Sequence, residues 1–365
     1  MPPIRIGVAG ACGRGRAYVG AARRHPHVRV AALCDTRDET MEALSRELGD
    51  VACFTAYEEM VESRCVDAVV VATPMHLHAP QSVFALDRDL HVLSEVTAAV
   101  DMSQARCLVE AARRSAARYM LAENCCYMRH VETVAAMVRD GLFGELTFAD
   151  GQYLHDCREL CASTPWRRRW HYGVNGNPYG THNLGPILQW LDDRVTEVAC
   201  AGSGRHHLDA CGEPFGIEDT TVTLCRTERG RLVELRLDIV SPRPPCLAYT
   251  LQGTEGVFES ARGAGDEHRV ALASQGGAMK WRPLAEFEAR YLPEAWRRMD
   301  TAAAASGHDG SDDRTFGAFV ECIASGAPSP IDVHAAMDMT LPGLVSTASI
   351  DSGGAWLPVP NSREW

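Results

Sequence analysis

The sequence predicts an α/β protein with a parallel sheet in its N-terminal part and an α+β arrangement with a mainly antiparallel, open sheet in its C-terminal part. Up to residue 125, short apolar segments alternate with helical stretches, which is typical of a parallel sheet with crossover helices. Beyond residue 125 the segments are longer and alternate between apolar and polar residues. A length of 365 residues suits two domains, which we expect over residues 1–125 and 126–365.

The apolar segments of the first part predict six strands. These are Ile4–Ala9, Val28–Cys34, Val51–Phe54, Val66–Ala72, His91–Ser94 and Arg118–Ala122. The fourth segment has almost no polar residue, as expected for a central parallel strand that is buried on both faces. A helix should follow the first strand as far as Arg24, and another should follow the second strand, where Met41, Leu44 and Leu48 have helical spacing.

The second part begins with a predicted helix over Val131–Arg139, which Gly141 should end. Alternation then predicts half-buried strands over Glu145–His155, Glu197–Ala201, Thr220–Cys225, Leu232–Ile239 and Leu247–Gly253. Further helices are expected over Asn183–Leu191 and Thr315–Ala324, and the acidic, Ala/Gly-rich segment 301–313 should be a loop. A sheet of alternating strands, with helices enough for one face only, predicts that its other face meets a partner subunit in a homodimer or homotetramer.

A glycine-rich turn follows the first strand and precedes the first helix. Such a turn presents backbone N–H groups and a helix N-terminus to a pyrophosphate, and here it contains Gly10, Cys12, Gly13, Arg14 and Gly15. Cys12 stands where the usual pattern has its middle glycine. Asp35 ends the second strand, where a carboxylate binds the ribose hydroxyls of NAD and repels the extra phosphate of NADP. The sequence therefore predicts a Rossmann domain that binds NAD, although Arg37 leaves NADP open.

Composition excludes several classes of function. The net charge of −12 makes general binding to nucleic acid or to an anionic membrane unfavourable, and no apolar run approaches the ~20 residues of a membrane span. The chain enters a strand pattern directly after its first residues, so we expect no signal peptide. Its 14 cysteines are scattered and form no CxxC pair, which favours reduced thiols. We therefore expect a soluble, cytoplasmic protein with a small-molecule substrate.

The densest group of residues that could bind a metal comprises His155, Cys157, Cys161 and His171. A zinc site at this group is an alternative to residues without a metal. No matching second pair follows the two cysteines, so we expect no metal. Among the 36 basic residues only Lys280 is a lysine, which excludes a catalytic lysine from the N-terminal half.

Two segments after the central strands carry a family resemblance: Thr73-Pro74-Met-His76-Leu-His78 and Glu95-Val96-Thr97. Together with the glycine turn they resemble the glucose–fructose oxidoreductase/inositol dehydrogenase (Gfo/Idh/MocA) superfamily, and the likeness continues to the segment 332–346. Dehydrogenases of that superfamily have Glu-Lys-Pro where this chain has Glu95-Val96-Thr97. They also place an aspartate four residues before a histidine, where this chain has Pro178 before His182.

One branch of the superfamily is more similar. The segments 123–129, 153–156, 166–167 and 176–186 look like those of the NAD-dependent α-N-acetylgalactosaminidase family of glycoside hydrolases, which also has valine in place of the lysine. The chain departs from that family at Thr97 and Gly180, where the family has prolines.

This resemblance implies a redox-neutral glycosidase. Its reaction oxidises sugar C3, eliminates the C1 substituent after loss of the C2 proton, adds water and reduces C3 again. The resemblance places His182 and Tyr179 at the catalytic centre, with Tyr127 as another candidate base. The implied substrate-binding residues are Arg167, Trp166, His155 and Asn177, and the cofactor residues beyond the glycine turn and Asp35 are Thr73, Pro74, His78, Glu95 and Asn124.

Each of these residues also has a structural interpretation. His182 could be a residue of the first helical turn, although histidine suits proton transfer near neutrality. Tyr179 and Tyr127 could be core aromatics with satisfied hydroxyls. Arg167 and Trp166 belong to a run that could be a solvated basic loop. His78 could be a turn residue, and His155 could pair with Asp156 to orient other groups.

Three functions stay open on the sequence. The leading one is a glycosidase that acts on a sugar, with an N-acetylated sugar as one candidate. The second is an NAD-dependent dehydrogenase of a sugar, an inositol or an aminosugar, which would accumulate NADH in proportion to its substrate. The third is a ligand-binding homologue without activity.

Overall fold

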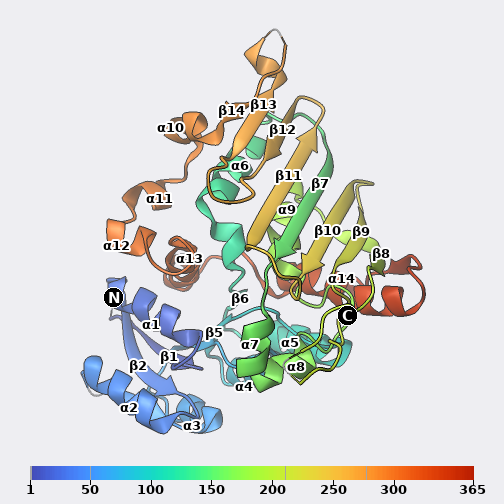
Figure 1. Ribbon diagram of the computed structural model, residues 1–365. Coiled ribbons are helices and arrows are strands. Elements are labelled where there is room, and N and C mark those ends of the chain that lie inside the picture. The colour runs from blue at the N-terminus through green and yellow to red at the C-terminus, as the bar shows by residue number, and fades with distance from the viewer. Residues whose placement is uncertain (1, 50, 210, 277) are drawn as a thin grey trace. The chain divides into compact units, whose positions relative to one another are not determined.

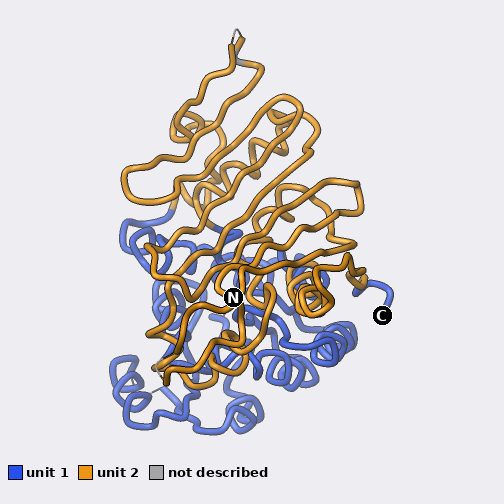
Figure 2. Tube along the Cα trace, turned by 45° about the vertical axis from the view of Figure 1, so that its right-hand side comes forward, with its two compact units in different colours: residues 1–127, 299–337, 362–365 blue, residues 128–298, 338–361 orange. Residues whose placement is uncertain are grey.

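The computed structural model describes residues 2–49, 51–209, 211–276 and 278–365. The chain divides into two compact units (Figure 2). Unit 1 comprises residues 1–127, 299–337 and 362–365, and unit 2 comprises residues 128–298 and 338–361. The first division falls close to the predicted boundary after residue 125. A single boundary does not describe the molecule, however, because the chain returns to unit 1 twice.

Unit 1 contains a six-stranded parallel sheet with the order β3-β2-β1-β4-β5-β6 (Figure 1). Its strands are β1 (Ile4–Ala9), β2 (Val28–Cys34), β3 (Ala52–Phe54), β4 (Ala68–Val71), β5 (His91–Ser94) and β6 (Tyr119–Leu121). All four residues of β4 are buried, as the apolar run predicts. The strand order reverses between β1 and β4, and the carboxyl ends at such a point are where open α/β sheets bind their ligands.

The helices between these strands are α1 (Gly15–Arg24), α2 (Asp38–Glu47), α3 (Tyr57–Glu62), α4 (His78–Leu86) and α5 (Met102–Arg114). Unit 1 also contains α12 (Thr301–Ala304) and α13 (Ser311–Ser325), which come from much later in the chain. Helix α13 packs against α1, with the rings of Tyr18 and Phe316 6.5 Å apart. Arg24 at the end of α1 makes a two-bond ion pair with Asp313.

The prediction of a loop over residues 301–313 is wrong. Asp300 caps α12 by accepting a hydrogen bond from the Ala303 amide, and α13 begins at Ser311 rather than Thr315. Both starts hold acidic residues, which stabilise the N-terminal end of a helix but also make a segment resemble a solvated loop in the sequence.

Unit 2 is built on a nine-stranded sheet with the order β14-β13-β12-β11-β7-β10-β9-β8-β15. Its longer strands are β7 (Leu146–Leu154), β8 (Val195–Gly202), β9 (Thr221–Thr227), β10 (Leu232–Asp238) and β11 (Cys246–Gly253). The shorter ones are β12 (Gly256–Glu259), β13 (Arg269–Leu272), β14 (Arg282–Pro283) and β15 (Leu357–Pro358). The sheet is antiparallel except for the pair β7–β10, so the expected mainly antiparallel sheet is confirmed.

The helices of unit 2 are α6 (Arg129–Arg139), α7 (Arg158–Ser163), α8 (Pro165–Trp170), α9 (Thr181–Leu191), α10 (Glu288–Tyr291) and α11 (Glu294–Arg298). The division between the units falls inside α14 (Val333–Asp351). Helix α9 packs against β7, β10 and β11, where Gly151 allows the backbone of Asn183 to approach closely. The buried Trp190 of α9 donates a hydrogen bond to the Val131 carbonyl of α6, 3.0 Å away. Among the described residues, no helix is both long and apolar enough to cross a membrane.

Candidate functional site

The glycine turn of unit 1 lies between the carboxyl ends of β1 and β4. Gly10 has φ +74°, and a Cβ on it would stand 2.2 Å from the Ala72 carbonyl oxygen. A Cβ on Gly15 would stand 2.7 Å from the Gly10 carbonyl oxygen. Only glycine fits at these two positions, so the tight turn into α1 is specified by the sequence itself.

Asp35 lies at the end of β2, directly beside the turn. Its Oδ2 accepts a hydrogen bond of 2.9 Å from the Cys12 amide, and Arg37 donates to Oδ1 from its backbone and its guanidinium. Burial raises the pKa of Asp35, but these hydrogen bonds outweigh burial and lower it, so the carboxylate is ionised at neutral pH. An ionised carboxylate next to the turn is what recognition of ribose hydroxyls requires.

The predicted residues after β4 are held together by hydrogen bonds. Thr73 donates from its hydroxyl to Gln81 Oε1 at 2.6 Å. His78 is buried, and its two ring nitrogens lie 2.7 Å from the Thr73 carbonyl and 3.0 Å from the Thr97 carbonyl. In this structure His78 therefore ties the segment after β4, which includes Pro74, to the segment after β5.

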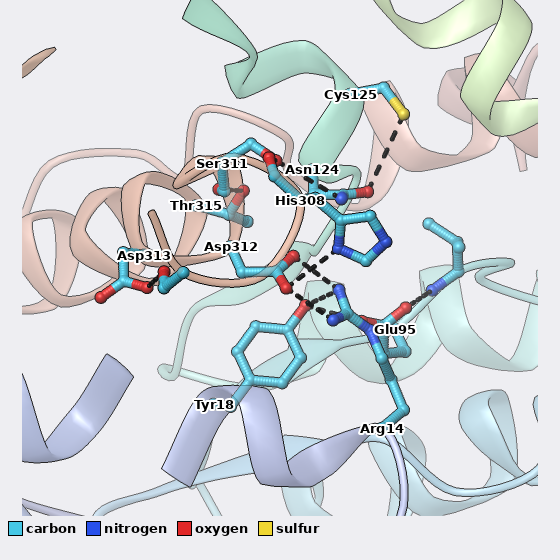
Figure 3. A network of polar contacts seen from close by, with 12 residues as sticks. Arg14, Tyr18, Glu95, Asn124, Cys125, His308, Ser311, Asp312, Asp313 and Thr315 are labelled. Atoms are coloured by element: carbon cyan, nitrogen blue, oxygen red, sulfur yellow. Dashed lines mark hydrogen bonds and ion pairs between the residues drawn. The ribbon is translucent and has the colours of Figure 1, made fainter. Parts of the chain in front are cut away.

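Glu95 and Asn124, which follow β5 and β6, are both buried (Figure 3). Glu95 Oε1 accepts from Arg14 Nε at 2.6 Å and from the Tyr18 hydroxyl at 2.7 Å. The Arg14 guanidinium is thus bound by the Glu95 carboxylate. The part of Arg14 that lies in the glycine turn is its backbone. Tyr127 is also buried in unit 1, with the Arg314 guanidinium carbon 5.5 Å from its ring centre.

Unit 2 brings Tyr179 and His182 together in an aromatic cluster. Their ring centres are 5.0 Å apart, and the ring of His171 lies 4.3 Å from that of Tyr179. Tyr153 of β7 completes the cluster, at 5.9 Å from Tyr179 and 5.2 Å from His182. His182 is in the first turn of α9, and its carbonyl oxygen accepts a 2.6 Å hydrogen bond from the Tyr249 hydroxyl.

Arg167 joins this cluster through His171. Its Nη1 lies 3.0 Å from His171 Nδ1, and because guanidinium only donates, Nδ1 is the acceptor and the imidazole proton is on Nε2. Burial lowers the pKa of His171 well below its usual value, and Arg167 and His182 lower it further. His171 is therefore neutral at pH 7. Trp166 is half-buried beside Arg167, with the guanidinium carbon 4.6 Å from its ring centre.

Asn177 lies in the loop between α8 and α9 and is buried. Its backbone N–H donates to Ser346 Oγ at 2.7 Å, and the backbone carbonyl of the preceding Gly176 accepts a hydrogen bond from the Thr221 hydroxyl at 2.8 Å. These contacts fix the loop that leads into Tyr179 and His182. The structure thus shows Asn177 anchoring this loop, and its role toward a substrate remains a prediction.

The remaining candidates lie at the end of β7. His155 is exposed, and the carboxylate of Asp156 makes a two-bond ion pair with Arg158, whose hydrogen bond lowers the pKa of Asp156. Asp156 is therefore bound to Arg158 through its side chain rather than to His155. Cys157 and Cys161 are buried in an apolar cluster with Tyr172, Phe215 and Ile217, among others.

Two residues of the cluster were missed as site residues by the sequence reasoning. The sequence indicates His171 only as a candidate zinc ligand, and it gives no role to Tyr153, which lies in the segment 153–156 of the family resemblance. The alternation of β7 gives the signal for Tyr153, because residues two apart share a face of a strand and Gly151 on that face meets α9. The contact of His171 with Tyr179 depends on a loop conformation, which residue spacing does not indicate.

Comparison with known proteins decides the family. The model of the glycosyl hydrolase 109 C-terminal domain matches residues 127–363, which is more than half of the chain. The chain belongs to glycosyl hydrolase family 109. The model of the oxidoreductase family with an NAD-binding Rossmann fold matches residues 4–123, so the predicted Rossmann domain and the NAD cofactor are confirmed.

Relatives of this glycosyl hydrolase family 109 member span nearly all of its length. A glycosyl hydrolase family 109 protein from Saccharopolyspora erythraea is 31% identical, over 98% of this chain and 83% of the relative. An α-N-acetylgalactosaminidase from Shewanella oneidensis is 27% identical, over 96% of this chain and 83% of the relative.

Solved structures show the same fold. Levoglucosan dehydrogenase in complex with NADH and levoglucosan has a TM-score of 0.83 at 17% identity, covering 98% of this chain and all of that one. The WlbA dehydrogenase from Bordetella pertussis, in complex with NADH and UDP-GlcNAcA, has a TM-score of 0.78 at 19% identity, covering 98% of each chain.

The residues of unit 1 in this family 109 protein fit a dinucleotide. The turn at Gly10 and Gly15 leaves no room for a Cβ, so the backbone itself is what a pyrophosphate would meet. Asp35 is ionised and next to the turn, where it would hold the adenosine ribose. Glu95 follows β5 at the carboxyl edge of the same sheet. NAD supplies hydride transfer when it is bound there.

Proposed function

We propose that this protein hydrolyses a glycoside of an N-acetylated hexose, with NAD returned to its starting state in every cycle. Held by the glycine turn and Asp35, NAD would supply the two hydride transfers that oxidise sugar C3 and later reduce it. Between these two transfers the C2 proton leaves, the C1 substituent is eliminated, and water adds at C1. The sum of these steps is hydrolysis, with no net oxidation of the sugar.

The observation that carries this proposal is the aromatic cluster of Tyr153, His171, Tyr179 and His182 in unit 2. It holds two phenols and two imidazoles, which are the groups that suit transfer of protons to and from hydroxyl and carbon acids near neutral pH. A hydrolase with the usual mechanism instead needs a pair of carboxylates at the scissile bond.

Within the cluster we assign proton transfer to Tyr179 and His182. A ketone at C3 lowers the pKa of the adjacent C2 proton by many units, and this brings the proton within reach of a phenolate or imidazole base. His171 is held neutral by its burial and by Arg167, so it adds no fixed charge beside Tyr179 and His182. Tyr127 of unit 1 remains a further candidate base.

Arg167 and Trp166 are assigned to substrate binding in this proposal. Both lie on α8, beside each other, and an indole face next to a guanidinium suits a sugar ring with its hydroxyls. His155 and Asn177 are assigned to the surroundings of the substrate, Asn177 through the loop that it anchors.

The specific activity test uses 4-nitrophenyl α-N-acetylgalactosaminide in deuterated water with a catalytic amount of NAD. We expect deuterium at C2 of the released sugar and no accumulation of NADH. A carboxylate-pair hydrolase would leave C2 unlabelled. Stoichiometric NADH with an unlabelled keto-sugar would make the protein a dehydrogenase. Binding without turnover across a panel of glycosides would favour a ligand-binding homologue.

The nine-stranded sheet supports a proposal of self-association. On the face opposite to α9, Phe148 pairs with Leu232 across β7 and β10, and Leu224 lies on the adjacent strand β9. Leu232 is 41% exposed, although it lies within a sheet. We propose that this face joins two copies of the chain in a homodimer or homotetramer, because burying such apolar side chains is favourable.

Light scattering at micromolar concentration should give the mass of two or four chains. Leu232→Glu should lower that mass, because it replaces an exposed apolar side chain of this face by a charge, while Arg226 on the paired strand keeps the strand compatible with folding. Leu160→Glu is the matched control, since Leu160 is 42% exposed on α7, outside the sheet, and should leave the mass unchanged. A monomeric wild-type protein contradicts the proposal.

A cytoplasmic location is proposed from the thiols. All fourteen cysteines lie outside any disulfide, and nine of them are buried. The five that are not buried are Cys12, Cys53, Cys65, Cys107 and Cys211. So many reduced thiols favour a reducing compartment.

A further inference from the structure

A network of charged side chains connects three segments of unit 1 (Figure 3). The Arg14 guanidinium, from the glycine turn, lies between two carboxylates. It donates from Nε to Glu95 Oε1 at 2.6 Å and from its two terminal nitrogens to the carboxylate of Asp312 at 2.6 and 2.7 Å. The Tyr18 hydroxyl also donates to Glu95. A segment nearly three hundred residues away along the chain therefore helps to hold the turn.

The network has more acidic than basic groups. The side chains of Glu95 and Asp312 are 9% and 1% exposed, while Arg14 is the one guanidinium that the described network contains. Burial raises the pKa of Asp312, but hydrogen bonds from Arg14 and His308 lower it to about 2. The network thus sets two carboxyl groups against one guanidinium, which is an acidic excess beside the turn that a pyrophosphate must approach.

His308 is the group that can remove this excess. Its Nδ1 lies 3.0 Å from Asp312 Oδ2, and its side chain is 52% exposed, so it exchanges protons with solvent. The hydrogen bond to Asp312 raises the pKa of His308, Glu95 adds to this effect, and partial burial and Arg14 oppose it. These are the charged groups that face His308, and their net effect raises the pKa of its imidazole, which favours the protonated form.

We propose that His308 is a positioning residue that sets the affinity for NAD through its charge: when it is protonated, the Arg14–Glu95–Asp312 network is neutral and the dinucleotide binds more tightly. The pyrophosphate carries negative charge, so an excess negative charge next to the turn repels it, and a proton on His308 cancels that excess. Binding of NAD should in turn favour uptake of this proton, because the two equilibria are linked. This proposal rests on the NAD cofactor and is independent of the reaction proposed above.

The test measures the dissociation constant of NADH for the full chain, by its nicotinamide fluorescence, from pH 5.5 to 8.5 at low ionic strength. For the wild type we expect affinity to fall by roughly threefold to tenfold as pH rises, the scale of one screened charge near a phosphate group. His308→Gln should bind weakly at every pH in this range. His308→Lys should bind tightly at every pH, because its charge is permanent and can pair with Asp312.

The opposite behaviour of these two variants separates charge from a structural role, since loss of packing would weaken both. His27→Gln is the control, because His27 is exposed in unit 1 and outside the network, and it should keep the wild-type slope. A wild-type affinity that does not change with pH overturns the proposal. A His308→Gln variant that retains the wild-type slope overturns it equally, whatever the Lys variant does.

Discussion

Replacement of His182 by alanine should lower kcat by about a hundredfold or more, the usual scale for a positioned acid or base. Tyr179→Phe, which removes only the hydroxyl, should have an effect of similar size. Both residues lie in the cluster of unit 2, with ring centres 5.0 Å apart. The measurement is steady-state turnover of 4-nitrophenyl α-N-acetylgalactosaminide. NADH affinity should be unchanged, because the cofactor residues belong to unit 1.

Matched controls exist for both changes. Tyr291→Phe removes a hydroxyl that donates to Asp140 on the surface, and His27→Ala removes an exposed imidazole of unit 1. Neither variant should change kcat by more than about twofold, since surface substitutions away from special features have small effects. Near-native turnover in both the His182 and the Tyr179 variants would contradict the assignment.

The second large effect is expected for Gly151→Ala. A Cβ at this position of β7 would stand 2.0 Å from the Asn183 carbonyl oxygen, in the first turns of α9. The helix must shift to make room, and His182 shifts with it. We expect the free energy of unfolding to fall by about 1–3 kcal/mol, as in other overpacked sites, and kcat to fall at least tenfold. Denaturant unfolding and turnover measure the two effects.

Gly317→Ala provides the comparison. A Cβ on Gly317, within α13, meets nothing within 4 Å, and alanine is the better helix former. This variant should be as stable as the wild type or slightly more so, with unchanged kcat. If Gly151→Ala behaved in the same way, close packing of α9 on β7 would have no bearing on the site.

The parallel strands of unit 1 were predictable because burial on both faces leaves an unbroken apolar run. Ile4–Ala9, Val28–Cys34 and His91–Ser94 match β1, β2 and β5 residue for residue. Helix α14 was not predicted, although it is 19 residues long, because Pro342 lies inside it and proline usually ends a helix. Strands β12 and β13 were also missed, since four residues are too few for a clear alternation.

The candidate site also contains residues whose positions were predictable from the sequence and residues whose contacts were not. The turn residues Gly10 and Gly15 and the acid Asp35 have positions that local chain geometry dictates, so their spacing was sufficient. The partners of Arg14 were not predictable, because Asp312 is 298 residues away and no local pattern connects the two. The same holds for His171 and Arg167, whose contact depends on the path of a loop.

The return of residues 299–337 to unit 1 has a consequence for how this protein can be recombined with its relatives. A fragment that ends at residue 127 contains the buried Glu95 and the Arg14 guanidinium but not the carboxylate of Asp312, and a partly buried cation that loses its partner is costly. A chimera with one crossover near residue 127 would combine Arg14 from one parent with the α13 of another. Exchange of the cofactor-binding module between family members therefore requires more than one segment from the same parent, and the glycine turn and the acidic pair at the start of α13 must come from that parent together.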